Sequence, residues 1–212
     1  MLPEKELHRV LARIPLTSAG GPWTRALAYR LLQGPPPDSK AGDPPQPLWP
    51  GGPSRRGARF NPKGGFGSIY LASDFLTALE EVGAVLNRPE IPPSTLRTPP
   101  WTLFAVEGFL ERVLDLTDPG TQHRLGTSLA ELTGDWRYSQ ALHLRGEAPL
   151  PPTQLLGKAA YESGRITALK YHSARRVGEG LGFAVFADRL VKGRASYLEI
   201  YDPDALIQQV LP

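Results

Sequence analysis

Two stretches of the chain concentrate basic residues without any acidic residue to balance them. Residues 44–73 contain Arg55, Arg56, Arg59 and Lys63, and residues 163–178 contain Arg165, Lys170, Arg175 and Arg176. Both stretches are rich in Gly, Ser or Asn, which let backbone N–H groups and small hydroxyls approach a ligand. Because Arg supplies a fixed fork of donors, this composition suits a phosphate or pyrophosphate. A solvated basic face is the alternative interpretation of each stretch.

The total charge of the chain does not reveal this pattern. The 212 residues carry 24 Lys and Arg against 21 Asp and Glu, a formal net charge of +3, so the remainder of the chain is net acidic. The two basic stretches lie far apart in sequence, and each flanks a predicted strand. We therefore expect them to meet at one anion-binding site.

Composition excludes several classes of site. The chain has no Cys, which rules out disulfides, thiolate zinc sites and Cys nucleophiles, and it leaves a reducing cytoplasm as the expected location. The four His are too widely spaced for a helical metal pair, so we expect no metal site: His8, His123, His143 and His172. No apolar run approaches the roughly 18 residues that would cross a bilayer, and the amino terminus does not resemble a signal peptide.

Familiar catalytic and nucleotide-binding motifs are missing. There is no GxxxxGK[ST] loop, and GFGSIY has Tyr70 where a dinucleotide fingerprint needs a third Gly. No Ser lies in a G-x-S-x-G turn. A nucleic-acid-binding module stays open as an alternative, although no helix carries interspersed Arg and Lys and no strand carries an aromatic ribbon.

The elements that must position these residues follow from periodicity. The pattern predicts an amphipathic helix at the amino terminus, within a helical appendage over 1–20, before a domain over 21–212. In that domain, residues 26–32 indicate a strand, and about 33–58 form a Pro- and Gly-rich loop without regular structure. Residues 68–72 indicate a second strand. Ser73 and Asp74 offer an N-cap for a helix that extends to about Asn87.

The rest of the chain interleaves strands and helices without a strict βαβ order. Strands are expected over 101–117, 166–171, 181–187 and 196–201. Helices are expected over 118–132, 139–144, 153–161 and 202–210. The fold class predicted is α+β, built on a mixed β-sheet with surrounding helices.

Three segments of the chain are notable for their order and spacing: GARFNPKGG, IYLASDFLTALEE and YHSARRVGEGLGFAVFADRL. In both respects they resemble the RES domain family, the toxin half of a class of bacterial toxin–antitoxin pairs, which is named for an Arg, a Glu and a Ser. Together they cover roughly residues 23–201. The long Pro-rich stretch before Arg59 departs from the family pattern.

The resemblance implies a fold similar to the bacterial ADP-ribosyltransferase toxins and NAD+ as a substrate, attacked at its nicotinamide ribose. Such proteins deplete NAD+ by phosphorolysis or hydrolysis, or they transfer ADP-ribose to a protein target. The implied partner is a helix-turn-helix antitoxin of the Xre type. No cofactor or metal is implied, because nicotinamide is already a cationic leaving group.

The resemblance also assigns roles to residues. Glu81 would stabilise the oxocarbenium-like transition state, and Arg59 would clamp the pyrophosphate or orient the ribose. Tyr70 would flank the nicotinamide, and Ser173 would hydrogen-bond the ribose. The substrate-binding residues also include Asn61, close to Arg59 in sequence, and Arg30, which matches a less specific early Arg of the family.

Each of these residues has a purely structural alternative. Glu81 could be a solvated helix residue, with Glu80 as the true match, although the spacing from Tyr70 favours Glu81. Tyr70 could belong to the core, Arg59 to the surface of a loop, and Ser173 to a turn or helix cap.

Overall fold

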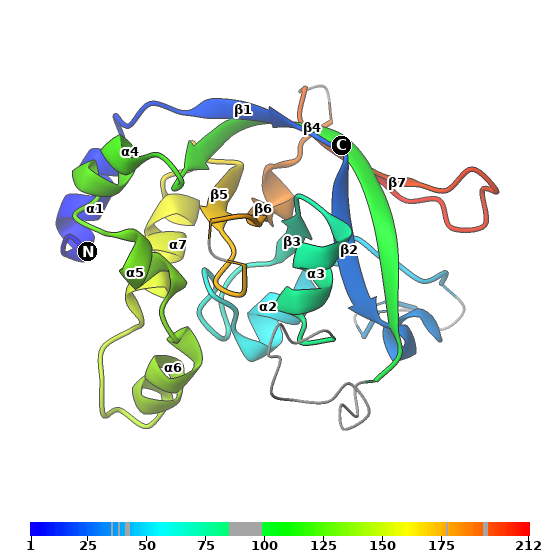
Figure 1. Cartoon of the computed structure of the whole chain (residues 1–212), viewed down its shortest axis with the longest axis horizontal. Helices are drawn as coiled ribbons and strands as arrows, with labels where there is room; N and C mark the ends of the chain where they lie inside the picture. The colour runs from blue at the N-terminus through cyan, green and yellow to red at the C-terminus, as the bar shows by residue number, and fades with distance from the viewer. Residues whose placement is uncertain (35, 38, 41–42, 85–98, 177, 193–194) are drawn as a thin grey trace.

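The computed structural model describes the whole chain except residues 35, 38, 41–42, 85–98, 177 and 193–194 (Figure 1). The described helices are α1 (Glu4–Leu11), α2 (Gly51–Arg56), α3 (Phe75–Glu81), α4 (Pro119–Arg124), α5 (Leu129–Thr133), α6 (Trp136–Leu144) and α7 (Pro152–Glu162), with two 3-10 helices, η1 (Tyr29–Leu32) and η3 (Ala187–Arg189). The strands are β1 (Thr17–Gly20), β2 (Trp23–Ala28), β3 (Ser68–Ala72), β4 (Trp101–Asp115), β5 (Ala168–His172), β6 (Leu181–Phe186), β7 (Tyr197–Tyr201) and β8 (Val210–Leu211). No helix in the described ranges is long and apolar enough to cross a membrane.

The strands form one mixed sheet, as the α+β prediction expected. Its order is β2-β3-β6-β5-β4-β7-β8, with β1 also paired to β4. Strand β2 pairs with both β3 and β4, so five strands close into a ring. Only the β4–β5 pairing is parallel among the pairs described, and the others are antiparallel.

Strand β4 holds the sheet together because it pairs with four other strands along its length. Its first half pairs with β2 and β7, and its second half pairs with β1 and β5. Gly108 lies at the changeover, where a Cβ atom would collide with the carbonyl oxygen of Tyr197 on β7. A strand that changes partners in this way needs a residue without a side chain at the close approach.

The ring is buried on both sides. Along β5 and β6, buried apolar residues alternate between two different core clusters, so both strands contribute to the core on both faces. Leu169 and Phe186 face the cluster under α1, α5 and α7, whereas Ala168 and Val185 face the cluster around Trp23. Figure 1 shows these helices gathered on one side of the sheet, with α2 and α3 next to β3.

The amino-terminal helix packs into this core. Leu7, Leu11 and Ile14 are buried in the same cluster as Phe186, and α1 lies against α7. The backbone of β1 is paired with β4. The helix was expected as an appendage over 1–20, but its packing makes it an integral part of the fold.

Several predicted elements differ from the structure. The strand expected over 26–32 lies over Trp23–Ala28 and gives way to η1, and α2 forms inside the loop expected to be irregular. The helix expected over 118–132 is broken in two at Gly126, whose φ is +61°. The helix expected over 202–210 is replaced by a turn and β8, because that strand pairs with β7.

The helix expected to reach about Asn87 ends earlier. Asp74 caps its start, as predicted, by accepting hydrogen bonds from Thr77 N at 2.8 Å and Thr77 Oγ1 at 2.7 Å. The last helical residue is Glu81, and Gly83 follows with a φ of +75°, a conformation that ends helices. The final three residues of the prediction, 85–87, lie outside the described residues.

We predict that the ion pair joining β4 to β5 makes stability depend on pH. Asp115 Oδ2 lies 2.8 Å from Lys170 Nζ, and Asp115 Oδ1 accepts from Thr117. Burial opposes the charged form of this carboxyl, but the bonds from Lys170 and Thr117 outweigh it and lower the pKa. Because the pKa of this carboxyl is lower in the folded state than in the unfolded state, where it is about 3.9, the charged form stabilises the fold at pH values above the unfolded pKa. This stabilisation is lost as the pH falls through the pKa of the folded state.

Asp115→Asn should therefore lower the free energy of unfolding by about 1–3 kcal/mol at pH 7. The deficit should narrow as the pH is lowered below about 4, measured by urea unfolding at a series of pH values. Asp204→Asn, at an exposed position, is the control. A deficit that stays constant from pH 7 to pH 3 would contradict this interpretation.

A second prediction concerns the contact between α7 and the loop that carries Arg59. A Cβ atom on Gly157 would overlap the carbonyl group of Phe60, and backbone on both sides cannot simply move away. Gly157→Ala should destabilise the protein by about 1–3 kcal/mol or more, measured by thermal or denaturant unfolding. Gly20→Ala, where nothing lies within 4 Å of the new atom, should be nearly neutral.

Candidate functional site

Glu81, at the end of α3, lies on the wall of a small cavity of about 190 Å³, here called the Glu81 pocket. Its Oε1 accepts a hydrogen bond from Ser173 Oγ at 2.5 Å and another from the backbone N–H of Ala174 at 3.2 Å. Among the described residues, both bonds go to this one oxygen, so Oε2 is left for a ligand. Glu80 points elsewhere: it is 4% exposed, and its Oε2 has no hydrogen-bond partner among the described residues.

Ser173 is a positioning residue in this structure and does not line the pocket. It is fully buried, and its hydroxyl donates to Glu81 while accepting from the backbone N–H groups of Arg175 and Arg176 at 3.1 Å each. The hydroxyl therefore folds the loop after β5 and fixes the carboxylate. It was expected to hydrogen-bond the ribose, but the structure directs it to Glu81.

Tyr70, on β3, is held rigidly by its hydroxyl. That group donates to Asn61 Oδ1 at 2.8 Å and accepts from the backbone N–H of Phe60 at 3.0 Å. Asn61 is fully buried and donates in turn to Phe66 O and Ser68 Oγ. Asn61 was expected among the substrate-binding residues, but its amide is occupied behind Tyr70.

Burial raises the pKa of the Tyr70 hydroxyl well above its usual range. Burial acts in the same direction on Tyr171, whose pKa is raised further by the nearby charge of Glu81. Both phenols are therefore neutral at physiological pH. They line the Glu81 pocket as uncharged aromatic surfaces beside a carboxylate.

Arg59 lines the same pocket but is anchored at its tip. Its Nη1 donates to the carbonyl oxygens of Leu132 at 2.8 Å and Gly134 at 2.9 Å, where α5 ends. The carbonyl end of a helix attracts a cation, so this contact is favourable. The turn that carries Arg59 is closed by two hydrogen bonds between Ala58 and Asn61.

Trp136 and Arg137 also line this pocket and were not foreseen from the sequence, whereas Tyr171 begins one of the segments that match the RES domain family. Trp136 and Arg137 begin α6, where Asp135 caps the helix, and the Arg137 guanidinium lies 4.9 Å from the centre of the Trp136 ring. Their nearness to Arg59 arises because Arg59 binds Gly134, two residues before Trp136. Nothing in the local sequence encodes that contact.

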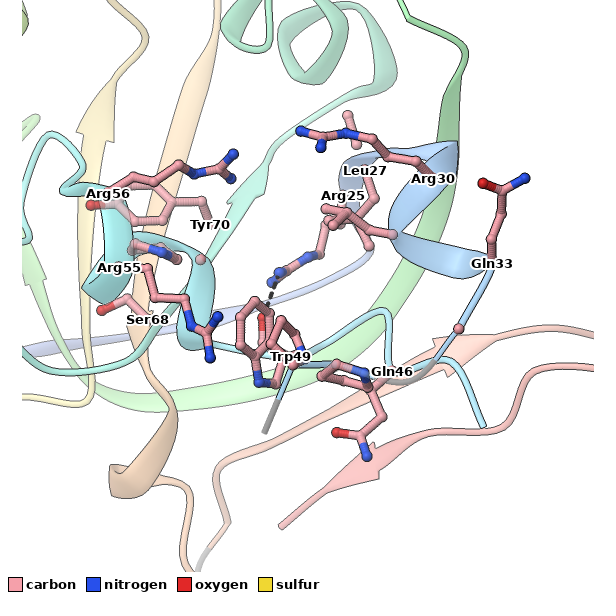
Figure 2. A pocket seen from close by; sticks show the side chains of 17 residues that line it. Arg25, Leu27, Arg30, Gln33, Gln46, Trp49, Arg55, Arg56, Ser68 and Tyr70 are labelled. Carbon is pink, nitrogen blue, oxygen red and sulfur yellow. Dashed lines mark hydrogen bonds between the residues drawn. The ribbon is translucent and has the colours of Figure 1, made fainter. Parts of the chain in front are cut away.

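A larger cavity of about 610 Å³ adjoins the Glu81 pocket and is here called the arginine pocket. Tyr70 and Ala26 line both cavities. Figure 2 shows the side chains of Arg25, Arg30 and Arg56 turned toward the space between β2 and α2, with Arg55 beside Trp49. The predicted substrate-binding residue Arg30 therefore lies in this cavity and not beside Glu81. Arg25 was not foreseen.

The two basic stretches do not form one continuous basic surface. In the second stretch, Lys170 pairs with Asp115, and Arg176 pairs with Asp74 and Glu179. Arg165 donates to the carbonyl oxygen of Leu11 in the amino-terminal segment. The expected meeting of both stretches at one anion site is therefore wrong for these side chains, and the second stretch contributes Ser173 instead.

The described residues contain one group whose ligand atoms lie close enough to hold a metal ion: Glu4, His8 and Glu162. It lies on the outer surfaces of α1 and α7, away from both cavities. Lys158 Nζ is 2.7 Å from Glu4 Oε1 and 3.9 Å from Glu162 Oε1, so an ammonium group is already paired with both carboxylates. The arrangement is that of a surface ion-pair network.

We predict that the Tyr70 hydroxyl stabilises the site. Tyr70→Phe would leave Asn61 Oδ1 and the Phe60 N–H buried without partners, which should cost about 1–3 kcal/mol in the free energy of unfolding. Tyr138→Phe, at an exposed position on α6, is the matched control and should be nearly neutral. Equal stability of the Tyr70 variant and the wild type would show that the hydroxyl does not hold this loop.

The chain is similar to known proteins in its fold and in its sequence family. The fold is similar to that of a chain in the crystal structure of the M. tuberculosis MbcT–MbcA toxin–antitoxin complex, with a TM-score of 0.61 and 20% sequence identity, over 93% of this chain and 90% of that chain. No curated protein matches the sequence. The family model described as the RES domain matches residues 27–203. This match spans most of the chain, including Arg59, Tyr70, Glu81 and Ser173, and the chain therefore belongs to the RES domain family.

Proposed function

We propose that this protein is the toxin of a toxin–antitoxin pair and that it consumes NAD+ by cleaving the bond between nicotinamide and ribose. The single observation that best supports this proposal is the Glu81 carboxylate, fixed through Oε1 by Ser173 and Ala174 at the wall of a pocket. Membership of the RES domain family and similarity in fold to a chain of a toxin–antitoxin complex support the same conclusion.

The geometry suits stabilisation of positive charge. As the C1′–N bond breaks, nicotinamide leaves with the bonding electron pair as a neutral molecule, and the ribose acquires oxocarbenium character. The free Oε2 of Glu81 would lie beside that charge or accept hydrogen bonds from the ribose hydroxyls. Because the other oxygen of the carboxylate is already fixed, the group needs little reorganisation to stabilise this charge.

The neighbouring side chains would place the nicotinamide. Tyr70 and Tyr171 offer neutral aromatic surface, and Trp136 adds a third ring to the lining of the same pocket. Arg59, anchored to α5, would contribute positive charge near the ribose phosphate. This chemistry proceeds without a metal or a redox cofactor, because the substrate carries its own leaving group.

The acceptor of ADP-ribose completes the reaction. Attack at C1′ by water yields ADP-ribose and releases a proton, whereas attack by inorganic phosphate yields ADP-ribose phosphate. Attack by a protein side chain would make the protein an ADP-ribosyltransferase. All three reactions use the same donor site, and mass analysis of the product distinguishes them.

The proposal includes a protein partner and a location. Its antitoxin would be a helix-turn-helix protein of the Xre type that covers the cleft, and both proteins would act in the cytoplasm. Contact with nucleic acid would then be indirect, through the antitoxin. The MbcT–MbcA complex supports the existence of such a partner.

The test compares two adjacent carboxylates. Purified protein should release nicotinamide from NAD+, and Glu81→Gln should reduce the rate about 100-fold or more. Glu80→Gln is the matched control, because Glu80 is one residue away but buried and turned from the pocket. It should retain most of the activity.

Two results would overturn the assignment. Full activity of Glu81→Gln would remove the carboxylate from the mechanism. Absence of nicotinamide release by the folded wild-type protein, with water, phosphate and cell lysate each offered as acceptor, would remove NAD+ as the substrate.

A further inference from the structure

Two glutamine side chains join α6 and α7 to the turn before Arg59. Gln154, near the start of α7, is fully buried, and its Nε2 donates to the carbonyl oxygen of Ala58 at 2.9 Å and to Gln140 Oε1 at 2.7 Å. The Nε2 of Gln140, on α6, donates in turn to the carbonyl oxygen of Arg56 at 3.2 Å. One chain of hydrogen bonds therefore begins and ends on the backbone of the same turn, and it is here called the amide clamp.

The amide clamp connects two parts of the wall of the Glu81 pocket. Arg59 lines that pocket and directly follows the turn that the clamp holds. Trp136 and Arg137, at the start of α6, line it as well. Gln140 follows them by four and three residues, so its side chain projects from the same side of the helix. The clamp therefore fixes the start of α6 relative to Arg59.

Helix α6 depends on such polar contacts because it buries none of its residues. A second cavity of about 190 Å³ lies beside it, lined by Trp136 and Ser139 of its first turn and by Pro152 and Thr153 at the start of α7. Helices in proteins take most of their stability from an apolar face packed on the core. Without such a face, α6 is positioned mainly by its hydrogen bonds.

The turn is shaped to receive the clamp. Gly57 lies between the two backbone carbonyls that accept the hydrogen bonds, and its φ is +79°. A Cβ atom at this position would overlap the side-chain amide of Gln140. The position therefore requires glycine both for its backbone conformation and for the approach of Gln140.

The amide of Gln154 is not the side chain that stability alone would favour. Its Oε1 is buried and has no hydrogen-bond partner among the described residues. An unsatisfied buried acceptor is unfavourable, and an apolar side chain of similar length would avoid it. The Ala58 carbonyl would keep a partner without Gln154, because it also accepts from the backbone N–H of Asn61 at 3.1 Å. The two bonds donated by Gln154 therefore serve placement more than stability.

We propose that Gln140 and Gln154 are positioning residues for the reaction at Glu81, and that they act by setting the separation between Arg59 and the start of α6. This inference rests on the proposed function, because that separation matters for a ribose and a nicotinamide held beside Glu81. Neither glutamine lines either cavity, so neither touches the substrate. A displacement of about 1 Å in a positioning contact lowers a rate by as much as about 100-fold.

The first experiment removes both donors of Gln154 and keeps the length of the side chain. Gln154→Met should lower kcat for nicotinamide release about 10-fold or more, with a smaller change in KM for NAD+. Its thermal unfolding midpoint should equal or exceed that of the wild type, because the unsatisfied Oε1 is removed as well.

Gln122→Met is the matched control. Gln122 also donates its Nε2 to a backbone carbonyl, that of Leu116, but it lies on α4 and lines neither cavity. This variant should keep the kcat and KM of the wild type.

The direction of the hydrogen bonds gives a second experiment. Gln154 donates to both of its partners, so a carboxylate at this position has no N–H to offer and faces two oxygens. Gln140 accepts from Gln154, and a carboxylate keeps that acceptor. Gln154→Glu should therefore lower kcat about 10-fold more than Gln140→Glu, although both substitutions add the same charge. The double change of both residues to Met should lose no more activity than Gln154→Met alone, because the two side chains act as one unit.

Hydrogen exchange measures the clamp without any substrate. In Gln154→Met, the backbone amides of residues 57–61 and 136–144 should exchange faster than in the wild type, because the clamp no longer restrains either segment. The amides of α4 should exchange at the same rate in both proteins.

Each outcome decides the inference. Unchanged kcat in folded Gln154→Met overturns it, whatever the exchange rates, and so do equal losses of kcat in Gln154→Glu and Gln140→Glu. If Gln154→Met does not fold, Gln140→Met takes its place at a half-buried position, with the same expected loss. If the wild type releases no nicotinamide, the proposed function fails and exchange decides the clamp: faster exchange of both segments upholds it as the link between them, and unchanged exchange overturns it.

Discussion

The hydrogen bond between Ser173 and Glu81 depends on the order of three strands in the sheet. Strand β6 is antiparallel to both β3 and β5, so the carboxyl ends of β3 and β5 lie on either side of the start of β6. Helix α3 begins directly after β3, and Ser173 comes directly after β5. Two residues 92 positions apart in sequence are thereby placed within hydrogen-bonding distance at one edge of the sheet. The carboxylate is fixed by the topology, and no local motif would fix it.

Glycine residues allow the elements at this edge of the sheet to approach one another closely. Gly182, on β6, lies under the ring of Tyr171, and a Cβ atom there would overlap the end of that ring. Gly180 is in similar contact with Thr77, the residue that Asp74 caps at the start of α3. Close approach of β5, β6 and α3 therefore requires Gly at both positions. The Glu81 pocket is the space that remains between these elements and the loop of Arg59.

Much of the fold and part of the site could be predicted from the sequence. The strand SIYLA, the Asp74 cap and the doubly buried strand LGFAVF have local signals, and the structure confirms them. The ends of helices were less predictable. Gly83 and Gly126 end helices because their φ angles are positive, and a Gly in a sequence does not by itself indicate a positive φ. The sequence of β8 shows little strand pattern, and the strand forms because it pairs with β7.

The limits of prediction from sequence are clearer still at the candidate site. Counting charge found the stretch that carries Arg55 and Arg56, but the same counting could not show that Lys170 and Arg176 are neutralised by Asp115 and Asp74, which lie outside their stretch. Arg25 escaped notice because it is a single charge in a strand. A lone Arg in the apolar segment WTRALA is nevertheless unusual, since Arg is almost never buried unless it is paired. This Arg within an apolar segment was the signal in the sequence from which an unusual role of Arg25 could have been predicted.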